Sequence, residues 1–476
     1  MPALRSTVPL MLALLATAAA ARDSLPPAVS QALARAKVPL EAVSIVVEEA
    51  GSHRLVLGHR AGASMNPASV MKLVTTLAAL EMLGPTWTWK TPVYTDGTVR
   101  DGVLQGNLYL QGQGDPKLVA ERIWLLLRRV QGLGIRQIAG DIVLDRSAFE
   151  AFNHDPAEFD GEALRPYNAA PDALLLNFKS VLMTFVPTPG GQTAELHVEP
   201  PLAGVNWPAQ VPLRDGACND YRSGLRADFS DPARPRFAGR YPAACGEKVW
   251  PLAWSDPAGF GARAIEGMWR AIGGQLSGRV REGRVPDGLA PAFALESPPL
   301  AELVRDINKY SNNVMTQQLF LTLSLQQRGL GTYAGSRELL QGWWRQRFGS
   351  GAEPQMSNGA GLSREDRVSA AALARLLQYA WASPLMPELM SSLPITGLDG
   401  TLRPGRWRSE GRAHLKTGSL RDVSAIAGYV HGPDGRRHVL VALINHPNAV
   451  AGRPALEALV EWTARRSPPT QKARIE

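Results

Sequence analysis

A serine and a lysine stand three residues apart at the start of the apolar segment NPASVMKLVTTLAALEML, residues 66–83. Asn66 suits an N-cap and Pro67 a first helical position, so the segment predicts a helix from Pro67. Residues i and i+3 share a helix face, which brings Lys72 to Ser69. A serine hydroxyl becomes nucleophilic when a neighbouring base takes its proton, and a buried lysine is able to be that base. The first turn also offers free N–H groups to an oxyanion.

Lysine is scarce in this chain, so its positions are informative. The chain has nine lysines against 42 arginines. Arginine stays protonated, whereas a desolvated lysine is able to act as a base. A lone Ser-x-x-Lys pattern still arises by chance about once or twice in a chain of this length. The pair therefore needs support from other segments.

A second polar segment, Tyr310-Ser311-Asn312-Asn313, separates two predicted helices. The hydroxyl of Ser311 and the amide of Asn313 stand two residues apart on a tight turn, where both are able to point into one cleft. Alone, the segment is also compatible with an ordinary turn between helices.

A third segment, HLKTGS at residues 414–419, is predicted to be a strand. Alternation puts Lys416 and Gly418 on one face and Thr417 and Ser419 on the other. The edge of such a strand offers N–H and C=O groups to an extended peptide, and Gly418 leaves room for close backbone approach.

The elements around these residues predict a single antiparallel sheet built from both ends of the chain. Two β-rich runs near the N-terminus form a hairpin, and three follow near the C-terminus, with helices between them and one after them. The fold class is therefore α+β. The predicted strands are residues 44–49, 53–59, 413–419, 423–432 and 436–446, and the main predicted helices are 27–36, 67–83, 299–311, 314–327, 367–382 and 455–466.

Between the N-terminal and C-terminal parts of this predicted domain, the sequence changes to short strand-like runs separated by many Pro- and Gly-containing turns. We expect a catalytic domain made of residues 22–91 and 259–476, interrupted by a β-rich insertion of one or two subdomains at 92–258. The insertion holds the two cysteines, Cys218 and Cys245. In an exported protein such a pair usually forms a disulfide, and two buried thiols are the alternative.

The N-terminus has the pattern of a secretory signal peptide, residues 1–21. Its apolar run is too short to span a membrane easily, and no cysteine follows it for a lipid anchor. We therefore expect a periplasmic protein without a stable membrane anchor. The net charge of +8 is spread along the chain without basic runs, which argues against a nucleic-acid partner. No pattern for a metal or a cofactor is present.

Taken together and in this order, Ser-x-x-Lys, Ser-x-Asn and Lys-Thr-Gly resemble the motifs of penicillin-binding proteins and class A β-lactamases. Here the middle motif is Ser-Asn-Asn rather than Ser-Asp-Asn, which leaves the role of Asn312 open. The long insertion and the segments GDIVLDRSAF, SNGAGLSREDRVS and GLDGTLR resemble the serine D-alanyl-D-alanine carboxypeptidase/endopeptidases, the low-molecular-mass class C penicillin-binding proteins. The resemblance covers nearly the whole mature chain. It implies a β-lactamase/transpeptidase-like domain that carries a large insertion.

The resemblance also implies catalytic roles. Ser69 would be acylated by a muropeptide ending in D-Ala-D-Ala, by a D-amino-acid cross-link, or by β-lactams as covalent inhibitors. Lys72 would be the general base, and Ser311 and Lys416 would relay a proton to the leaving amine. No cofactor would be required.

Further residues would bind the substrate peptide. Asn313 would hold its backbone, and Thr417 and Ser419 would take its terminal carboxylate. The N–H groups of Ser69 and Ser419 would form the oxyanion hole.

Weaker parallels concern the rim of the cleft. Arg364 would line the cleft or remain a surface arginine. Glu162 or Asp160 would pair with the diaminopimelate amine, with Tyr167 packed beside it, although acidic loop residues are usually just solvated.

Three other functions are alternatives to this one. A slowly turning over penicillin-binding sensor or scaffold of the cell wall remains an alternative, because it would share the same motifs. A β-lactamase is disfavoured by the insertion. A Ser-His-Asp hydrolase finds no support, because the chain lacks a G-x-S-x-G motif. The balance of carboxypeptidase and endopeptidase action, the oligomeric state and the role of the insertion are open at this level.

Overall fold

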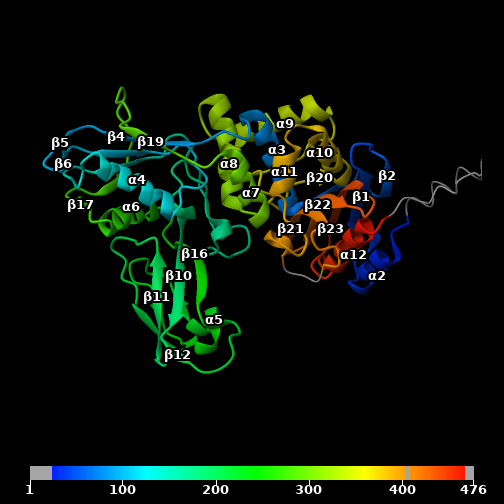
Figure 1. The fold of residues 1–476 in the computed structure, drawn as a ribbon, viewed down its shortest axis with the longest axis horizontal. Coiled ribbons are helices and arrows are strands. Elements are labelled where there is room, and N and C mark those ends of the chain that lie inside the picture. The colour runs from blue at the N-terminus through cyan, green and yellow to red at the C-terminus, as the bar shows by residue number, and fades with distance from the viewer. Residues whose placement is uncertain (1–23, 404–406, 467–476) are drawn as a thin grey trace, which may run out of the picture. The chain divides into compact units, whose positions relative to one another are not determined.

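The computed structural model describes residues 24–403 and 407–466, so the expected signal peptide lies outside the described residues. The chain divides into two compact units (Figure 1). The first is drawn from Met1–Pro85, Leu300–Asn312 and Arg337–Glu476, and the second from Thr86–Pro299 and Asn313–Ser336. Among the described residues, no helix combines the length and the apolar character needed to cross a membrane.

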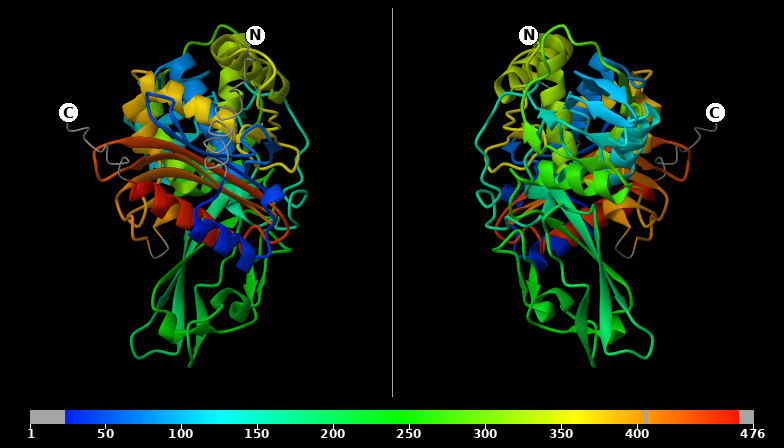
Figure 2. Two further views of the ribbon diagram at one scale, coloured as in Figure 1. Left: turned by 90° about the vertical axis from the view of Figure 1, so that its right-hand side faces the viewer. Right: turned by 90° about the vertical axis from the view of Figure 1, so that its left-hand side faces the viewer.

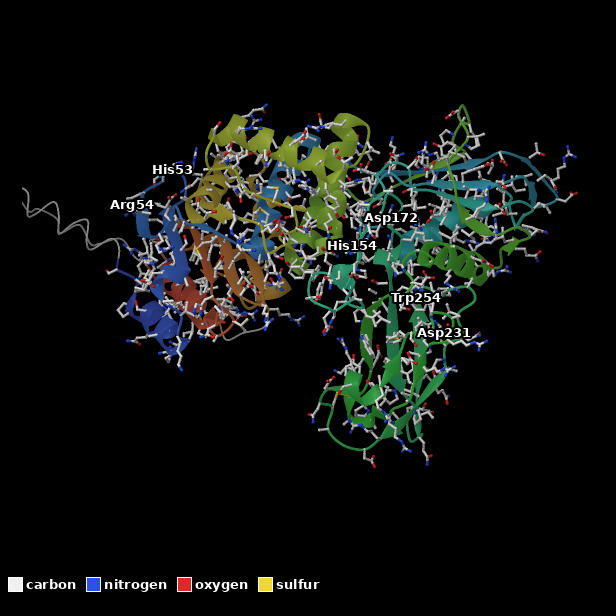
Figure 3. The ribbon with its side chains drawn as sticks, turned by 180° about the vertical axis from the view of Figure 1, so that it is seen from behind. His53, Arg54, His154, Asp172, Asp231 and Trp254 are labelled. Carbon is white, nitrogen blue, oxygen red and sulfur yellow. A yellow bond between two sulfur atoms is a disulfide. The ribbon has the colours of Figure 1, made fainter. Side chains whose placement is uncertain are left out.

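The main sheet of the first unit, in the described part of the chain, is antiparallel with the strand order β2-β1-β23-β22-β21, and β3 and β20 form a separate two-stranded antiparallel sheet. The β1–β2 hairpin turns at His53 and Arg54 (Figure 3), and Arg54 forms an ion pair with Glu49. β1 pairs with β23 from Val43–Ile444 to Glu49–His438, so the two ends of the chain meet at the centre of the sheet. This confirms the predicted sheet. Its strands are β1 (Val43–Glu49), β2 (Leu55–His59), β21 (Ala413–Leu420), β22 (Val423–His431) and β23 (Arg437–Asn445).

Helices cover this sheet, and its central strands are therefore buried on both faces. Figure 2 shows α2 (Pro27–Arg35, blue) and α12 (Arg453–Ala464, red) together on one face, where both join the apolar core with β1 and β23. α10 (Ala370–Ala382) packs against β1 and β23 and caps its N-terminus with the Ser369 hydroxyl. The other elements of this unit are η1 (Leu40–Ala42), β3 (Ser64–Met65), η2 (Ala68–Met71), α3 (Lys72–Leu83), α7 (Leu300–Tyr310), β20 (Val368–Ser369), α11 (Met386–Ser392) and η6 (Gly400–Leu402).

Two helices of more than twelve described residues are absent from the sequence-based prediction: α4 (Ala120–Gly132), which lies in the expected β-rich insertion, and α9. α9 (Tyr333–Phe348) begins in the residues of the second unit and continues in those of the first. Its sequence, YAGSRELLQGWWRQRF, has two glycines and no clear apolar stripe, which hides its helical period.

The second unit combines small sheets with helices. One sheet has the order β18-β9-β7-β4-β19 and another β17-β8-β6-β5. Their strands are β4 (Lys90–Thr95), β5 (Thr98–Arg100), β6 (Val103–Gln105), β7 (Leu108–Gln111), β8 (Gln137–Ile138), β9 (Ile142–Asp145), β17 (Gln275–Leu276), β18 (Val280–Glu282) and β19 (Phe293–Glu296). The unit's helices of more than ten residues, as far as they are described, are α4 (Ala120–Gly132), α6 (Phe260–Ala271) and α8 (Asn313–Arg328).

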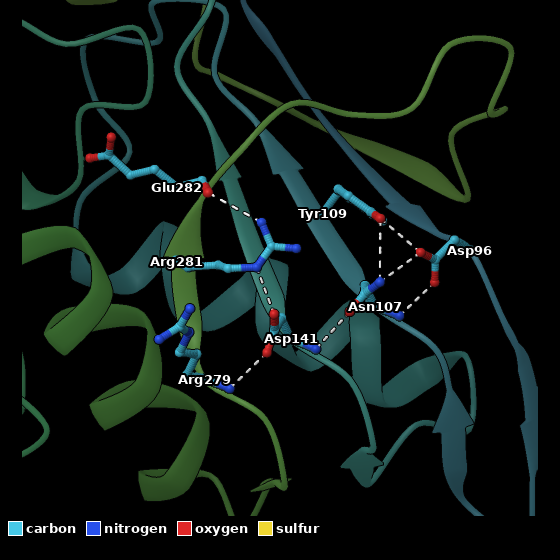
Figure 4. Close-up of polar contacts among 7 residues, drawn as sticks. All are labelled: Asp96, Asn107, Tyr109, Asp141, Arg279, Arg281 and Glu282. Carbon is cyan, nitrogen blue, oxygen red and sulfur yellow. Dashed lines mark hydrogen bonds and ion pairs between the residues drawn. The ribbon is translucent and has the colours of Figure 1, made fainter.

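Polar side chains fasten the ends of these strands (Figure 4). Asp96 accepts the backbone N–H of Asn107 at 2.5 Å and the Tyr109 hydroxyl at 2.7 Å. Asn107 in turn accepts the N–H of Asp141 at 2.8 Å, and Arg281 Nε donates to Asp141 at 2.6 Å. The cluster therefore joins β4, β7, β9 and β18, and its hydrogen bonds serve the fold.

A further sheet, β15-β12-β11-β10-β16, extends from this unit together with the two-stranded β13-β14 and α5 (Tyr221–Leu225). Cys218 and Cys245 are joined in a disulfide here, which confirms the predicted pairing. The strands are β10 (Ser180–Pro187), β11 (Thr193–Glu199), β12 (Gln210–Arg214), β13 (Ala227–Asp228), β14 (Arg236–Phe237), β15 (Tyr241–Pro242) and β16 (Lys248–Ala253).

The second unit is larger than the expected insertion at 92–258. It runs from Thr86 to Pro299 and also takes α8. α6 begins at Phe260, where helical periodicity returns in the sequence, but Phe260 and Ala264 pack into the core that includes α4. Periodicity shows where a helix lies but not which core its apolar stripe joins.

Candidate active site

Ser69 lies in a short 3₁₀ turn, η2, and Lys72 is the first residue of α3. The prediction of one helix from Pro67 is therefore wrong at its first turn. The reason is Ala68, whose φ of 46° is left-handed and interrupts an α-helix. Asn66 secures this backbone, because its side chain accepts the N–H of Ala68 at 2.8 Å while its own N–H donates to Asn445 at 2.7 Å.

The 3₁₀ turn still brings the predicted pair together, since side chains at i and i+3 eclipse there. Lys72 Nζ donates to Ser69 Oγ at 3.0 Å and to the carbonyl of Ala360 at 2.6 Å. Lys72 is fully buried. Burial lowers the pKa of Lys72 well below its usual value, the charge of Lys416 lowers it further, and Asp366 opposes both. A lysine in this position is suited to accept the serine proton.

Lys416 and Ser311 form a second lysine–hydroxyl pair. Lys416 Nζ donates to Ser311 Oγ at 2.8 Å and to the carbonyl of Thr417 at 2.7 Å. Burial lowers the pKa of Lys416 to about 7. Ser311 follows the end of α7 with a left-handed φ of 57°, a conformation that is sparsely populated and found at functional sites. Two residues 105 positions apart are thereby joined by a hydrogen bond.

Gly418 explains why β21 approaches the serine so closely. A side chain at this position would collide with the carbonyl of Pro67, and its Cβ would lie 3.1 Å from the backbone nitrogen atoms of Ser69 and Val70. Only glycine permits this packing, as the sequence predicts for a strand that meets another backbone. The contact places Lys416 and Ser69 on the same side of β21.

These residues open into one cavity of about 410 Å³ in the first unit. Ser69 and Ser311 line it together with Thr417 and Ser419. Thr401 closes against Thr417, with 2.7 Å between their hydroxyl oxygens. The other lining residues are Leu402, Trp407, Gly418, Ser424, Ala425, Ile426, Arg453, Leu456 and Glu457. The cavity therefore combines the hydroxyl of Ser69, which Lys72 contacts, with several further hydroxyl groups.

The sequence model of the D-Ala-D-Ala carboxypeptidase 3 (S13) family matches residues 25–466. The chain belongs to this family. This S13 member is 28% identical over 457 residues to the D-alanyl-D-alanine carboxypeptidase of Actinomadura sp. (strain R39), which covers 89% of this chain and 82% of the relative. It is 25% identical over 432 residues to D-alanyl-D-alanine carboxypeptidase DacB of Haemophilus influenzae, with 85% of each chain covered.

Solved structures show the same fold. Penicillin binding protein 4 (dacB) of Haemophilus influenzae superposes with a TM-score of 0.72 at 22% identity, over 91% of this chain and 99% of that one. A predatory endopeptidase of Bdellovibrio bacteriovorus, Bd3459, superposes with a TM-score of 0.54 at 14% identity, over 89% and 93% of the two chains. The S13 protein is thus a serine-type D-Ala-D-Ala carboxypeptidase of the class C penicillin-binding type, an enzyme that hydrolyses peptidoglycan.

The remaining predicted site residues, Asn313, Arg364 and Glu162, have contacts of their own. Asn313 is the first residue of α8 in the second unit, where its amide donates to the carbonyl of Tyr167 at 3.4 Å. Arg364 of this S13 enzyme is exposed and lies 3.8 Å from Asp422. Glu162, in the second unit, is exposed and pairs with Arg165 at 3.0 Å.

The acidic loop around Glu162 has a defined conformation. Asp160 accepts the Tyr167 hydroxyl and the Asn168 amide, each at 2.8 Å, and also the N–H of Glu162 at 3.0 Å. Burial and the hydrogen bond to Asp160 raise the pKa of Tyr167 to about 12. Asp160 therefore organises the loop through three hydrogen bonds, whereas the side chain of Glu162 contacts only Arg165 among the described residues.

Sequence reasoning missed four contributors to the S13 site. The Ala360 carbonyl contacts Lys72, and Asp366 acts on its pKa from the same loop. Thr401 and Arg453 line the cavity. For Ala360, Asp366 and Thr401 the only signal in the sequence was that SNGAGLSREDRVS and GLDGTLR resemble the family's segments, and Arg453 lies outside both. Neither segment has a spacing that indicates chemistry.

Proposed function

We propose that Ser69 carries an acyl-enzyme intermediate and that Lys72 is its general base. The supporting observation is the 3.0 Å contact between Lys72 Nζ and Ser69 Oγ, combined with burial that lowers the pKa of Lys72. Neutral Lys72 takes the hydroxyl proton as Oγ attacks the carbonyl carbon of the penultimate D-Ala. The N–H groups of Ser69 and Ser419 then stabilise the oxyanion, each worth about 3 kcal/mol.

The leaving amine requires a proton, which we assign to the Ser311–Lys416 pair. With a pKa of about 7, Lys416 is able to give and regain a proton near neutral pH. Its 2.8 Å contact with Ser311 Oγ supplies the path to the nitrogen of the departing D-Ala. The proton that Lys72 took from Ser69 passes to the Ser311–Lys416 pair, which gave its own to the amine, so Lys72 is neutral again. Water then attacks the acyl carbonyl carbon as Lys72 takes its proton, and Lys72 returns that proton to Ser69 Oγ as the ester bond breaks.

Substrate binding falls to the residues around this pair. Thr417 and Ser419 present hydroxyl groups to the terminal carboxylate. Gly418 lets β21 pack against the turn that carries Ser69, which keeps these hydroxyl groups near the serine. The amide of Asn313 binds the substrate backbone.

The rim residues complete the proposed peptide site. Glu162 pairs with the amine of diaminopimelate, and Arg364 contributes to the rim of the cleft. Both side chains are exposed, as such contacts require.

We also propose that the enzyme is exported to the periplasm, cleaves D-amino-acid cross-links as well as termini, and is acylated by β-lactams. Penicillin binding protein 4 has a structure in complex with a β-lactam, and Bd3459 has one acylated by penicillin G. Bd3459 is described as a peptidoglycan endopeptidase. These shared properties would follow from the same serine and the same fold.

Fluorescent penicillin tests the nucleophile. We expect the wild-type protein to be labelled and the Ser69→Ala protein to remain unlabelled while keeping its circular dichroism spectrum. Labelling of the Ser69→Ala protein would refute the assignment. Release of D-Ala from a pentapeptide tests turnover, and labelling without release would instead favour a penicillin-binding sensor.

A further inference from the structure

Arg453 lies outside the three sequence motifs, but its charged side chain reaches the part of the cavity lined by the hydroxyl groups of Thr417 and Ser419. Arg453 is the first residue of α12, just after Gly452, and it lines the same cavity as Ser69. Its guanidinium Nη2 donates to Ser419 Oγ at 3.1 Å. Arg453 is an exposed residue, so a ligand has access to it.

The direction of approach follows from the alternation of β21. Lys416 and Gly418 face the turn that carries Ser69, so Thr417 and Ser419 face the opposite side. α12 lies on that opposite side, where Leu456 packs into the same core as Ile426 of β22. Arg453 therefore meets Ser419 from the face to which its hydroxyl points.

The charge of Arg453 is available for a ligand. Among the described residues, no carboxylate lies within ion-pair distance of its guanidinium, and its hydrogen bond to Ser419 uses one of five N–H donors. Glu457, one helical turn on, also lines the cavity. Burial raises the pKa of Glu457 and the nearby Arg453 opposes this rise, so the two side chains share one electrostatic environment without forming an ion pair.

We propose that Arg453 binds the free carboxylate of the residue that leaves, beside the hydroxyl groups of Thr417 and Ser419. A guanidinium provides a planar fork that matches a carboxylate, whereas hydroxyl groups alone carry no formal charge. The inference rests on the proposed acyl-enzyme function. It adds that Arg453 sets specificity, because it favours peptides whose scissile amide is followed by a free α-carboxylate.

Paired substrates test this role. Arg453→Met is expected to lower kcat/KM roughly ten- to a hundredfold for a peptide ending in D-Ala-D-Ala, the usual worth of a charged hydrogen bond. The same peptide ending in D-Ala-D-alaninamide has no carboxylate, so its kcat/KM should change less than about twofold. Arg453→Lys should restore part of the loss, because it returns the charge without the fork.

Arg465→Met provides the matched control. Arg465 follows the other end of α12 and pairs with Glu461 at 3.4 Å, so its loss removes the same charge away from Ser69. We expect this variant to treat both peptides as the wild type does. Equal losses for the acid and the amide in Arg453→Met would overturn the proposal, since a structural role would not distinguish them.

Acylation by benzylpenicillin and by its methyl ester gives a second measurement that does not depend on turnover. Arg453→Met should slow acylation by the acid and leave acylation by the ester nearly unchanged. An unchanged acid-to-ester ratio would contradict carboxylate binding even if Ser69 is the nucleophile. Failure of the nucleophile assignment is separately visible, because the Ser69→Ala protein would then still be labelled.

Discussion

Two regions of the first unit each bury a lysine, and they use it in opposite ways. At the start of α3, Lys72 contacts the hydroxyl of Ser69 and a backbone carbonyl. At the end of α7, Lys309 is equally buried but contacts the carboxylate of Asp399 at 2.5 Å. A charged partner compensates for the lost hydration of an ammonium group, whereas neutral partners leave much of that cost in place. The difference separates a lysine held in an ion pair from the lysine that we propose as the general base.

The Lys309 region shows what the ion pair does. Burial disfavours the charged form of Asp399, but hydrogen bonds from Lys309 and from the N–H of Ile395 outweigh it, and the pKa of Asp399 lies below its usual value. The pair links α7, which ends just before Ser311, to η6, which carries Thr401. Lys309 therefore holds together the two elements that lead to Ser311 and Thr401, which line the cavity.

Replacement of the catalytic lysine should have the largest effect. Lys72→Met is expected to slow penicillin acylation by roughly 10³–10⁴-fold, because the base is lost. It should also raise the free energy of unfolding, since a buried ammonium is removed. The gain should be greatest at low pH and shrink as the pH rises toward the usual pKa of lysine, because the native state then no longer carries the buried charge. Stopped-flow kinetics measures the acylation rate, and urea unfolding at several pH values measures the free energy of unfolding. A Lys72→Met protein less stable than the wild type would contradict the contrast between Lys72 and Lys309.

Lys416→Met comes next. Acylation should fall by about 10²–10³-fold through loss of the relay. The acid limb of the remaining pH–rate profile should move to higher pH, because the charge of Lys416 no longer lowers the pKa of Lys72. The variant should be more stable by about 1–4 kcal/mol below pH 7, a gain that fades between pH 7 and 10.5. An acid limb that stays in place would show that the two lysines are not coupled.

Lys309→Met should give the opposite sign for stability. We expect the free energy of unfolding to fall by about 1–3 kcal/mol, because Asp399 loses its partner while remaining partly exposed. Part of this loss should disappear in acid, where Asp399 is protonated in both proteins. Penicillin acylation should remain within about tenfold of the wild type. The double variant with Asp399→Asn measures the interaction energy between the two side chains. An interaction energy of zero would show that the ion pair does not stabilise the fold.

Asp366→Asn should have the smallest effect. Asp366 is buried, which raises its pKa, and its oxygen accepts the N–H of Ser357 at 2.8 Å, a bond that asparagine is able to keep. Removal of the carboxylate should lower the pKa of Lys72 further and move the acid limb of acylation to lower pH. The maximal rate should change by less than about threefold. A shift to higher pH would show that Asp366 does not act on Lys72 through its charge.

Much of the fold could be predicted because its signals are local. The hairpin at the N-terminus and the three strands at the C-terminus are β-rich runs bounded by turn residues, and all five join one sheet. The two cysteines pair as expected. The limits of the second unit and α9 were not predicted, because the choice of core depends on contacts distant in the sequence.

The site shows the same division. Spacing brought Lys72 to Ser69, and the glycine of Lys-Thr-Gly indicated a close backbone approach at Gly418. The left-handed Ala68 was invisible, since alanine has no preference for that conformation. Its φ is maintained by Asn66 and by Asn445, which lies 379 residues away in the chain.

The sequence alone determined which side chains with nucleophilic, basic and hydrogen-bonding groups are present, and which of them share a turn or a strand face. Only the tertiary structure decided their chemistry. Lys72, Lys309 and Lys416 have the same side chain and are all buried, but they meet different partners. The pKa of a lysine depends on the water that folding removes and on charges brought from elsewhere in the chain, and neither quantity is contained in local spacing.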